Sequence, residues 1–488
     1  MIIHRLNNNT GNEYELQTFI EQNSIEIYDS LIVESYERLD NQRQAFESFI
    51  LSKYSLFQVL DYSKQKNKSF LYALLSVSER LGMHSQFEQL YFLAKRKNVE
   101  LTDRLEAASN FLMNVIEVND YSKRIDKVLS LLISSYQDQE DSLNEVLATL
   151  THFYLEVYKN FADYNYQAVQ NFSSLLLSGL NKEEYDTLNT LEVQSLLRSS
   201  FLDYDSGYSR IVNVLDNYLD VKFSSEGFNH SDILVESGTD YAKSLEDIEA
   251  ECSSLYDLVY ERYSSIKDDN IFRSLERGVQ VLTYEEQLLA YIYSYGRMHF
   301  AKLQAALKCI DKFDSTNIEI IDWGCGQALA TISLLEDVKN RSQYLAVNSV
   351  TLIEPSELAL KRAALHTQKF DKAVRVRTVN KDLDSVTTED FVTQQQTLKI
   401  HLFSNILDID LFSMSKLIEN IKYTFKGNNI FVCVSPYINE YKTQRLDDFV
   451  DAFEQYPSFQ LIEEKNQKAG EWENRWTRVV RVFSVTIN

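Results

Sequence analysis

The spacing of apolar residues divides the chain into two parts. Up to about residue 316, apolar residues recur at steps of three and four, as in the run VLATLTHFYLEVY that follows Asp141-Ser-Leu-Asn-Glu145. This pattern is typical of amphipathic helices that begin with a capping residue. From Asn317 the pattern changes to short runs of β-branched residues that alternate with helical stretches. Such alternation indicates a parallel sheet covered on both faces.

We therefore predict a multidomain protein with an all-α N-terminal half and a C-terminal α/β doubly wound, Rossmann-like sheet. The candidate strands are residues 318–323, 349–354, 374–379, 399–404, 429–435, 459–464 and 478–485, with early helices at 328–338 and 357–368. Only a short, polar stretch connects the last two candidate strands. We expect these two strands to be antiparallel, because a parallel connection needs a crossover of a dozen or more residues, usually helical.

The helical half contains a weak periodic signal. All three prolines lie at or after position 355, so helices before that point are uninterrupted. Tyr121, Tyr166 and Tyr208 each precede an apolar helical run, at spacings of 45 and 42 residues. Stacked helix hairpins, as in tetratricopeptide-like solenoids, have periods of this kind. An irregular helical bundle is equally consistent with the spacing.

Changes in composition suggest the domain boundaries. Residues 222–244 are polar, contain two glycines and separate two strongly helical regions, as linkers do. We predict a helical domain at 1–221, a linker at 222–244, a helical connection and lid at 245–316, and the Rossmann-like domain at 317–488.

Charge and cysteine content limit the classes of function. The 49 basic and 72 acidic residues give a net charge of −23, which disfavours a nucleic-acid partner without excluding it. The four cysteines form no CxxC pair, so no zinc site or disulfide framework is indicated. The N-terminal sequence resembles no secretory signal, and no apolar run is long enough to span a membrane. We expect a cytoplasmic protein without a metal centre or a membrane partner.

The strongest chemical signal follows the first candidate strand. Asp322 ends an apolar run, and Gly324 and Gly326 follow it at alternate positions before a helix. Glycine lets the backbone turn sharply and approach a ligand closely, and open α/β sheets bind ligands at the carboxyl ends of their strands. An ordinary tight turn without a ligand is the alternative interpretation.

Polar residues also end the next candidate strands. Glu354 ends the second strand, where a carboxylate has two oxygens to accept hydrogen bonds from adjacent hydroxyls. A structural alternative is that it caps the following helix. Asp382 follows the third strand, with Asp384 as a competitor, and Ser404-Asn405 ends the fourth.

These motifs resemble those of class I S-adenosylmethionine-dependent methyltransferases over roughly residues 283–488. The third glycine of the family pattern is Ala328 here. The resemblance implies S-adenosylmethionine as the cofactor, with its amino-acid end at the Asp322–Gly326 turn, its ribose on Glu354 and its adenine near Asp382. It places Ser404 and Asn405 where the acceptor meets the methyl group. Asn405 is not followed by the two prolines that mark many amino-group methyltransferases.

The resemblance implies methyl transfer by direct in-line attack, a reaction that depends chiefly on alignment and needs no conspicuous base. The catalytic residues and the acceptor therefore stay unassigned. Arg297 and His299 are candidates for a lid over the cofactor carboxylate. We expect the helical half to bind a protein acceptor or partner. The alternatives are an inactive methyltransferase-fold scaffold and a nicotinamide-dependent oxidoreductase, whose fingerprint would not have Leu at position 329.

Overall fold

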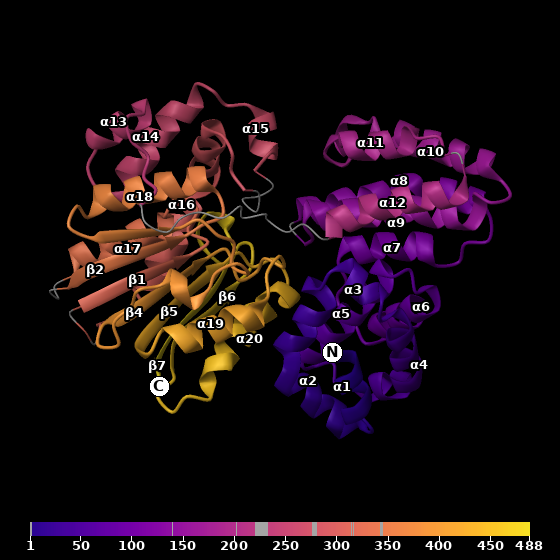
Figure 1. Ribbon diagram of the computed structural model, residues 1–488, viewed down its shortest axis with the longest axis horizontal. Helices are drawn as coiled ribbons and strands as arrows, with labels where there is room; N and C mark the ends of the chain where they lie inside the picture. The colour runs from indigo at the N-terminus through magenta and orange to yellow at the C-terminus, as the bar shows by residue number, and fades with distance from the viewer. Residues whose placement is uncertain are drawn as a thin grey trace. The chain divides into compact units, whose positions relative to one another are not determined.

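The computed structural model describes residues 2–138, 140–201, 203–219, 233–275, 281–313, 315, 317–341 and 345–488. The chain divides into two units, Met1–Lys222 and Phe223–Asn488, which Figure 1 shows as ribbons. Among the described helices, none is both long and apolar enough to cross a membrane.

The described residues of the first unit form helices and connecting turns, as predicted. Its elements are α1 (Ile2–Asn9), α2 (Glu13–Tyr28), η1 (Asp29–Val33), α3 (Tyr36–Asp40), α4 (Arg43–Val59), α5 (Gln65–Arg80), α6 (His84–Arg96), α7 (Asp103–Leu112), α8 (Val118–Gln137), α9 (Leu143–Phe161), α10 (Tyr166–Leu180), η2 (Glu183–Leu188), α11 (Leu191–Arg198) and α12 (Tyr204–Leu219). Helices that follow one another in sequence pack together, as α7 does with α8 and α8 with α9. Ser142 and Glu145 form a capping box at the start of α9, where the sequence indicated a cap.

The three tyrosines of the expected repeat have different surroundings. Tyr121, the fourth residue of α8, is buried and its hydroxyl accepts from Asn160, whereas Tyr166 is the half-buried first residue of α10. Tyr208 is exposed on α12. The three positions are therefore not equivalent in the packing of the helices, although sequential helix pairs are present.

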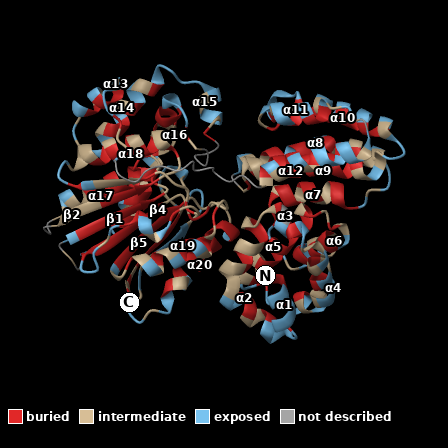
Figure 2. Cartoon of the chain, in the orientation of Figure 1, coloured by how far each residue is buried: buried red, intermediate tan, exposed pale blue. Residues whose placement is uncertain are grey.

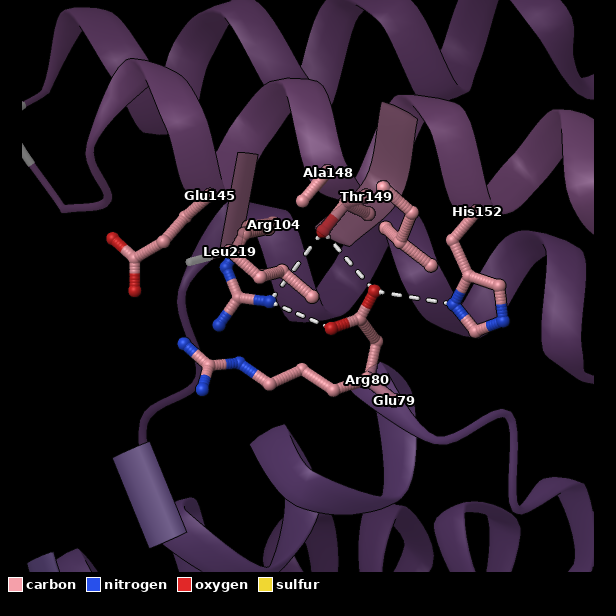
Figure 3. A pocket seen from close by; sticks show the side chains of 9 residues that line it. Glu79, Arg80, Arg104, Glu145, Ala148, Thr149, His152 and Leu219 are labelled. Carbon is pink, nitrogen blue, oxygen red and sulfur yellow. Dashed lines mark hydrogen bonds and ion pairs between the residues drawn. The ribbon is translucent and has the colours of Figure 1, made fainter. Parts of the chain in front are cut away.

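Buried charges join helices α5, α7 and α9 within this unit (Figure 3). The Arg104 guanidinium forms ion pairs with Glu79 (3.0 Å) and Asp141 (2.9 Å), and all three side chains are at most 4% exposed. His152 lies between Glu79 (3.6 Å) and Glu156 (3.3 Å). Although burial opposes its charge, these two carboxylates raise the pKa of His152 to about 9. The network satisfies its own charges, since each buried ion has an opposite partner.

The second unit contains a seven-stranded sheet in the order β3-β2-β1-β4-β5-β7-β6. The strands are β1 (Asn317–Trp323), β2 (Ala346–Ile353), β3 (Arg375–Val379), β4 (Leu398–Ser404), β5 (Gly427–Ser435), β6 (Gln460–Gln467) and β7 (Arg478–Ile487). Strands β1 to β5 pair in parallel, and β7 is antiparallel to both β5 and β6. Each predicted strand is confirmed to within a few residues, and the last pair is antiparallel as expected.

Helices cover both faces of the sheet (Figure 1). Residues of α16 (Glu285–Leu307), α17 (Leu329–Asn340) and α18 (Glu357–Phe370) share an aliphatic core with Ile318 and Ile320 of β1. On the opposite face, Trp323 stacks on Phe403, and Phe449 of α20 (Glu440–Glu454) packs on Phe403. Helix α19 (Met414–Thr424) packs beside α20. Figure 2 shows the strands as buried between these layers.

Part of the expected linker belongs to the sheet unit. Residues 222–232 lie outside the described part of the chain. Beyond them, the Leu234 N–H donates to Oγ1 of Thr378 (2.9 Å), and Glu236 forms a buried ion pair with Arg362 of α18. Helix α13 (Asp240–Glu246) follows, then α14 (Cys252–Ser264) and α15 (Asp269–Arg273). Residues 233–244 are thus packed against the sheet unit rather than free, because their polar and aromatic side chains find buried partners there.

Candidate functional site

The turn after β1 has the backbone shape that the two glycines predicted. The φ angles of Gly324, Gly326 and Ala328 are +63°, +50° and +63°. A Cβ on Gly324 would lie 2.7 Å from Cδ1 of Ile406, so this position excludes a side chain by contact as well as by conformation. At Gly326 no described atom would lie within 4 Å of a Cβ, so the backbone borders open space. Ala328 adopts the left-handed conformation with a side chain, which costs about 1–2 kcal/mol.

Asp322 lies beneath this turn and is 1% exposed. Its Oδ2 accepts from the hydroxyl (2.7 Å) and the backbone N–H (3.2 Å) of Thr331 in α17. Its Oδ1 is buried and has no hydrogen-bond partner among the described residues. Burial raises the pKa of Asp322 to about 7. Oδ1 of Asp322 is therefore available to accept a hydrogen bond from a ligand or to contact a cationic group of a ligand.

Glu354 reaches the same turn from the end of β2. Its Oε2 accepts from the Gly326 N–H (3.0 Å), and its Oε1 accepts from the Ser356 N–H (3.0 Å). Burial raises the pKa of Glu354 to about 7. The hydroxyl of Ser356, not the carboxylate of Glu354, caps α18. Each carboxylate oxygen can accept a second hydrogen bond, so Glu354 can still receive ligand hydroxyls.

The sequence interpretation missed Asn380, which follows β3. Its Nδ2 donates to the carbonyl oxygens of Glu354 and Pro355, at 2.9 Å each, and so holds the loop after β2 in place. Asp382, the predicted adenine contact, accepts from the Ser385 N–H (2.7 Å). Its competitor Asp384 accepts from the Ser413 N–H (3.0 Å) ahead of α19. Asp384 therefore links two loops, and Asp382 stays the candidate.

The end of β4 faces α16. Asn405 has a φ of +56°, and its Nδ2 donates to Nε2 of His299, 2.7 Å away. Within the described chain, Oδ1 of Asn405 and Oγ of Ser404 are buried without hydrogen-bond partners. Burial lowers the pKa of His299 to about 3, with a further effect from Lys302, so this imidazole is neutral.

Of the two residues considered for a lid, only His299 reaches the site. The exposed Arg297 lies with its guanidinium 4.5 Å from the ring centre of Tyr256. The N-terminal part of α16 is held over the turn, since Nε2 of Gln327 donates to the carbonyl of Leu288 (3.0 Å). Tyr291 and Tyr295, one turn apart on α16, continue the face that carries His299.

The seven predicted residues thus lie at the carboxyl ends of β1 to β4. Asp322, Gly324, Gly326 and Glu354 meet at one turn, whereas Ser404 and Asn405 lie at the neighbouring strand end. Asp382 lies in the loop after β3. The described residues contain no cluster of three or more metal-binding side chains. With its sheet order and antiparallel β7, this unit has the predicted doubly wound, Rossmann-like fold.

No protein-family model and no curated protein matches the chain. Solved structures that resemble it include a class I S-adenosylmethionine-dependent methyltransferase from Listeria monocytogenes, described as putative, with 11% identity and a TM-score of 0.30 over 75% of this chain and 88% of that one. A plantazolicin methyltransferase in complex with SAH has 10% identity and a TM-score of 0.30 over 47% of this chain and 100% of that one. The magnesium protoporphyrin IX methyltransferase from Synechocystis, with bound SAM, has 10% identity and a TM-score of 0.28 over 52% and 100%.

Proposed function

We propose that the chain is an S-adenosylmethionine-dependent methyltransferase. The observation that carries the proposal is the meeting of Asp322 and Glu354 at the left-handed turn 324–328, at the edge of the sheet where such folds bind ligands. The two carboxylates suit the two polar ends of the cofactor, an ammonium group and a ribose with adjacent hydroxyls.

The residues present fit this cofactor. Oδ1 of Asp322 is a buried acceptor with no donor among the described residues, and the open space beside Gly326 leaves room next to Glu354. When bound, the cofactor supplies a methyl group on a positively charged sulfur, which a nucleophile attacks in line. The chain binds and aligns the two substrates, and its part in the reaction is chiefly their positioning.

Asn405 and His299 are the residues that we assign to the acceptor side. Their side chains are in contact where the methyl group would be delivered, and both lie between the sheet and α16. A neutral imidazole accepts a hydrogen bond at one nitrogen and donates one from the other. His299 can thus hold the acceptor by a hydrogen bond without opposing a cationic sulfur.

Titration calorimetry of the full chain with S-adenosylmethionine and S-adenosylhomocysteine tests the cofactor assignment. Binding of both ligands, lost in Asp322→Ala and retained in Asp337→Ala on the distant end of α17, supports it. An absence of binding by the parent chain contradicts it. Turnover with a methyl acceptor separates an enzyme from an inactive scaffold of the same fold.

We further propose that the helical unit recruits a protein acceptor. The support is its extended helical surface in a chain of net charge −23, which disfavours nucleic acid. Pull-down with the isolated helical half, compared with the isolated C-terminal half, tests this role. Capture of the acceptor by the helical half alone supports the proposal, whereas full methylation by the C-terminal half alone, or RNA binding with steep salt dependence, contradicts it.

A further inference from the structure

Helix α16 carries a buried lysine one turn beyond His299. Lys302 is 0% exposed, and its Nζ has no hydrogen-bond partner among the residues that the structure describes. Residues three apart on a helix lie on the same side, so Lys302 and His299 face the same strand ends. Lysine is almost never fully buried unless it is paired.

The other cations near Lys302 have partners of their own. The nearby loop after β4 holds Asp408 and Asp410, and α20 holds Lys442 and Arg445. Lys442 pairs with Asp410, and Arg445 lies 3.7 Å from Asp410 while donating to two backbone carbonyls. Lys442 and Arg445 thus have partners of their own, whereas Nζ of Lys302 has no hydrogen-bond partner among the described residues. A buried charge without a partner is strongly unfavourable, so the burial of Lys302 needs an explanation.

None of the described groups that face Lys302 forms a hydrogen bond with its Nζ. His299 is neutral, and Asn405 and Ser404 carry no charge. Asp408 accepts from the hydroxyl of Ser435 (2.8 Å), and burial raises its pKa. Burial lowers the pKa of Lys302 itself to about 8, with Asp408 acting in the opposite direction. Lys302 is therefore still mainly protonated at neutral pH, as a cation that lacks a close partner.

We propose that Lys302 is the counter-charge for a carboxylate that one of the two substrates brings to the end of β4. The inference rests on the proposed function and extends it. The carboxylate belongs either to the amino-acid end of the cofactor or to the methyl acceptor. In both cases it pairs with the buried ammonium of Lys302, and the Ser404 hydroxyl and Oδ1 of Asn405, which are buried without partners among the described residues, offer further polar contacts.

Calorimetry distinguishes the two sources. The full chain is titrated with S-adenosylhomocysteine and with its decarboxylated analogue, in the parent and in Lys302→Met. The matched control is Lys399→Met, since Lys399 is equally buried at the opposite end of β4 and donates to the carbonyl of Lys426. If the cofactor carboxylate pairs with Lys302, the parent chain should bind S-adenosylhomocysteine about tenfold or more tightly than the decarboxylated analogue, as expected for a charged hydrogen bond. That preference disappears in Lys302→Met and stays in Lys399→Met.

A second measurement detects an acceptor carboxylate. Lysine labelled at Cε and Nζ allows the Lys302 resonance to be titrated by NMR with acetate as the probe, in the chain saturated with S-adenosylhomocysteine. Lys302→Arg assigns the resonance even if Lys302→Met does not fold. Acetate that raises the pKa of Lys302, without a preference between the two adenosyl ligands, assigns the site to the acceptor.

The proposal is overturned if Lys302→Met leaves the ligand preference unchanged and acetate does not move the Lys302 resonance. If instead the proposed function is wrong, neither adenosyl ligand binds the parent chain. Titration with acetate in the absence of these ligands then still decides whether Lys302 receives an anion.

Discussion

The backbone N–H of Gly326 donates to the carboxylate of Glu354 over 3.0 Å, joining the turn after β1 to the end of β2. Twenty-eight residues separate the two in sequence. Because the bond is internal to the protein, the turn and the acid are already held together before a ligand arrives, which lowers the ordering cost of binding.

Replacing Glu354 with alanine should weaken the binding of S-adenosylhomocysteine by about 1.5–3 kcal/mol, the usual range for hydrogen bonds to a charged group. Calorimetry of the folded variant measures this loss. Glu357→Ala is the control, because Glu357 pairs with Lys361 on the outer side of α18, and both side chains are partly exposed. Equal affinities of Glu354→Ala and the parent would mean that this carboxylate only orders the loop.

Cofactor affinity should rise with pH and level off above about 7. Burial raises the pKa values of Asp322 and Glu354 to about 7, from ordinary values of about 4. Between about pH 4 and about pH 7 these two carboxyl groups are protonated in the folded chain and ionised in the unfolded chain. Their contribution to the free energy of unfolding is therefore fully present below about pH 4 and is lost as the pH rises through about 7.

A cationic ligand favours the ionised carboxylates, so its binding must displace these protons at low pH. Calorimetry from about pH 5.5 to about 8.5 measures the effect. Asp322→Asn should bind weakly and show a flatter pH profile. A parent profile that is flat across this range would show that neither acid ionises on binding.

Gly324→Val should abolish cofactor binding while the sheet stays folded. A side chain there meets Ile406 and opposes a φ of +63°. Gly326→Ala meets no described atom within 4 Å but still opposes a φ of +50°. This variant should lose about 1–2 kcal/mol of stability. Circular dichroism and calorimetry check both variants, and full affinity of a folded Gly324→Val would refute the placement of the ligand.

In the helical unit, Arg104→Met should destabilise the fold by about 3–5 kcal/mol, because it leaves Glu79 and Asp141 buried without their shared cation. Arg80→Met is the matched control. Arg80 lines a small cavity together with Glu79 and Arg104 (Figure 3), but it donates to the carbonyl of Ile32 and is partly exposed. Denaturant unfolding compares the two variants, and similar losses would argue against a special role for the buried pair.

The same network predicts a loss of stability at high pH. The pKa of His152 is raised to about 9 from about 6.5. A raised pKa stabilises the fold fully below the unfolded value, and this contribution is lost as the pH rises through about 9. Thermal unfolding of the parent should therefore show a falling melting temperature between about pH 7 and about 9.5, and His152→Gln should reduce that slope.

The sequence predicted the sheet well because each strand is a local run of β-branched residues. The ends of the strands likewise predicted the turn at Gly324 and Gly326 and the acid at Glu354. Contacts between residues that lie far apart in sequence could not be predicted in this way. Asn405 and His299 are 106 residues apart, and no local pattern marks Asn380 or Lys302 as part of a site. The polar composition of residues 233–244 predicts a linker, because their partners in the sheet unit are distant in sequence and no local pattern shows them.

The buried pair of Glu236 and Arg362 limits how far the chain can be shortened. A gene fragment that begins at the first strand of the sheet, or at α16, would remove Glu236 and leave the guanidinium of Arg362, which is 1% exposed, without its closest carboxylate. Removing one member of such a pair costs about 3–5 kcal/mol, a large part of the stability of an ordinary domain. A fragment for crystallisation or assay should therefore start no later than Ile233.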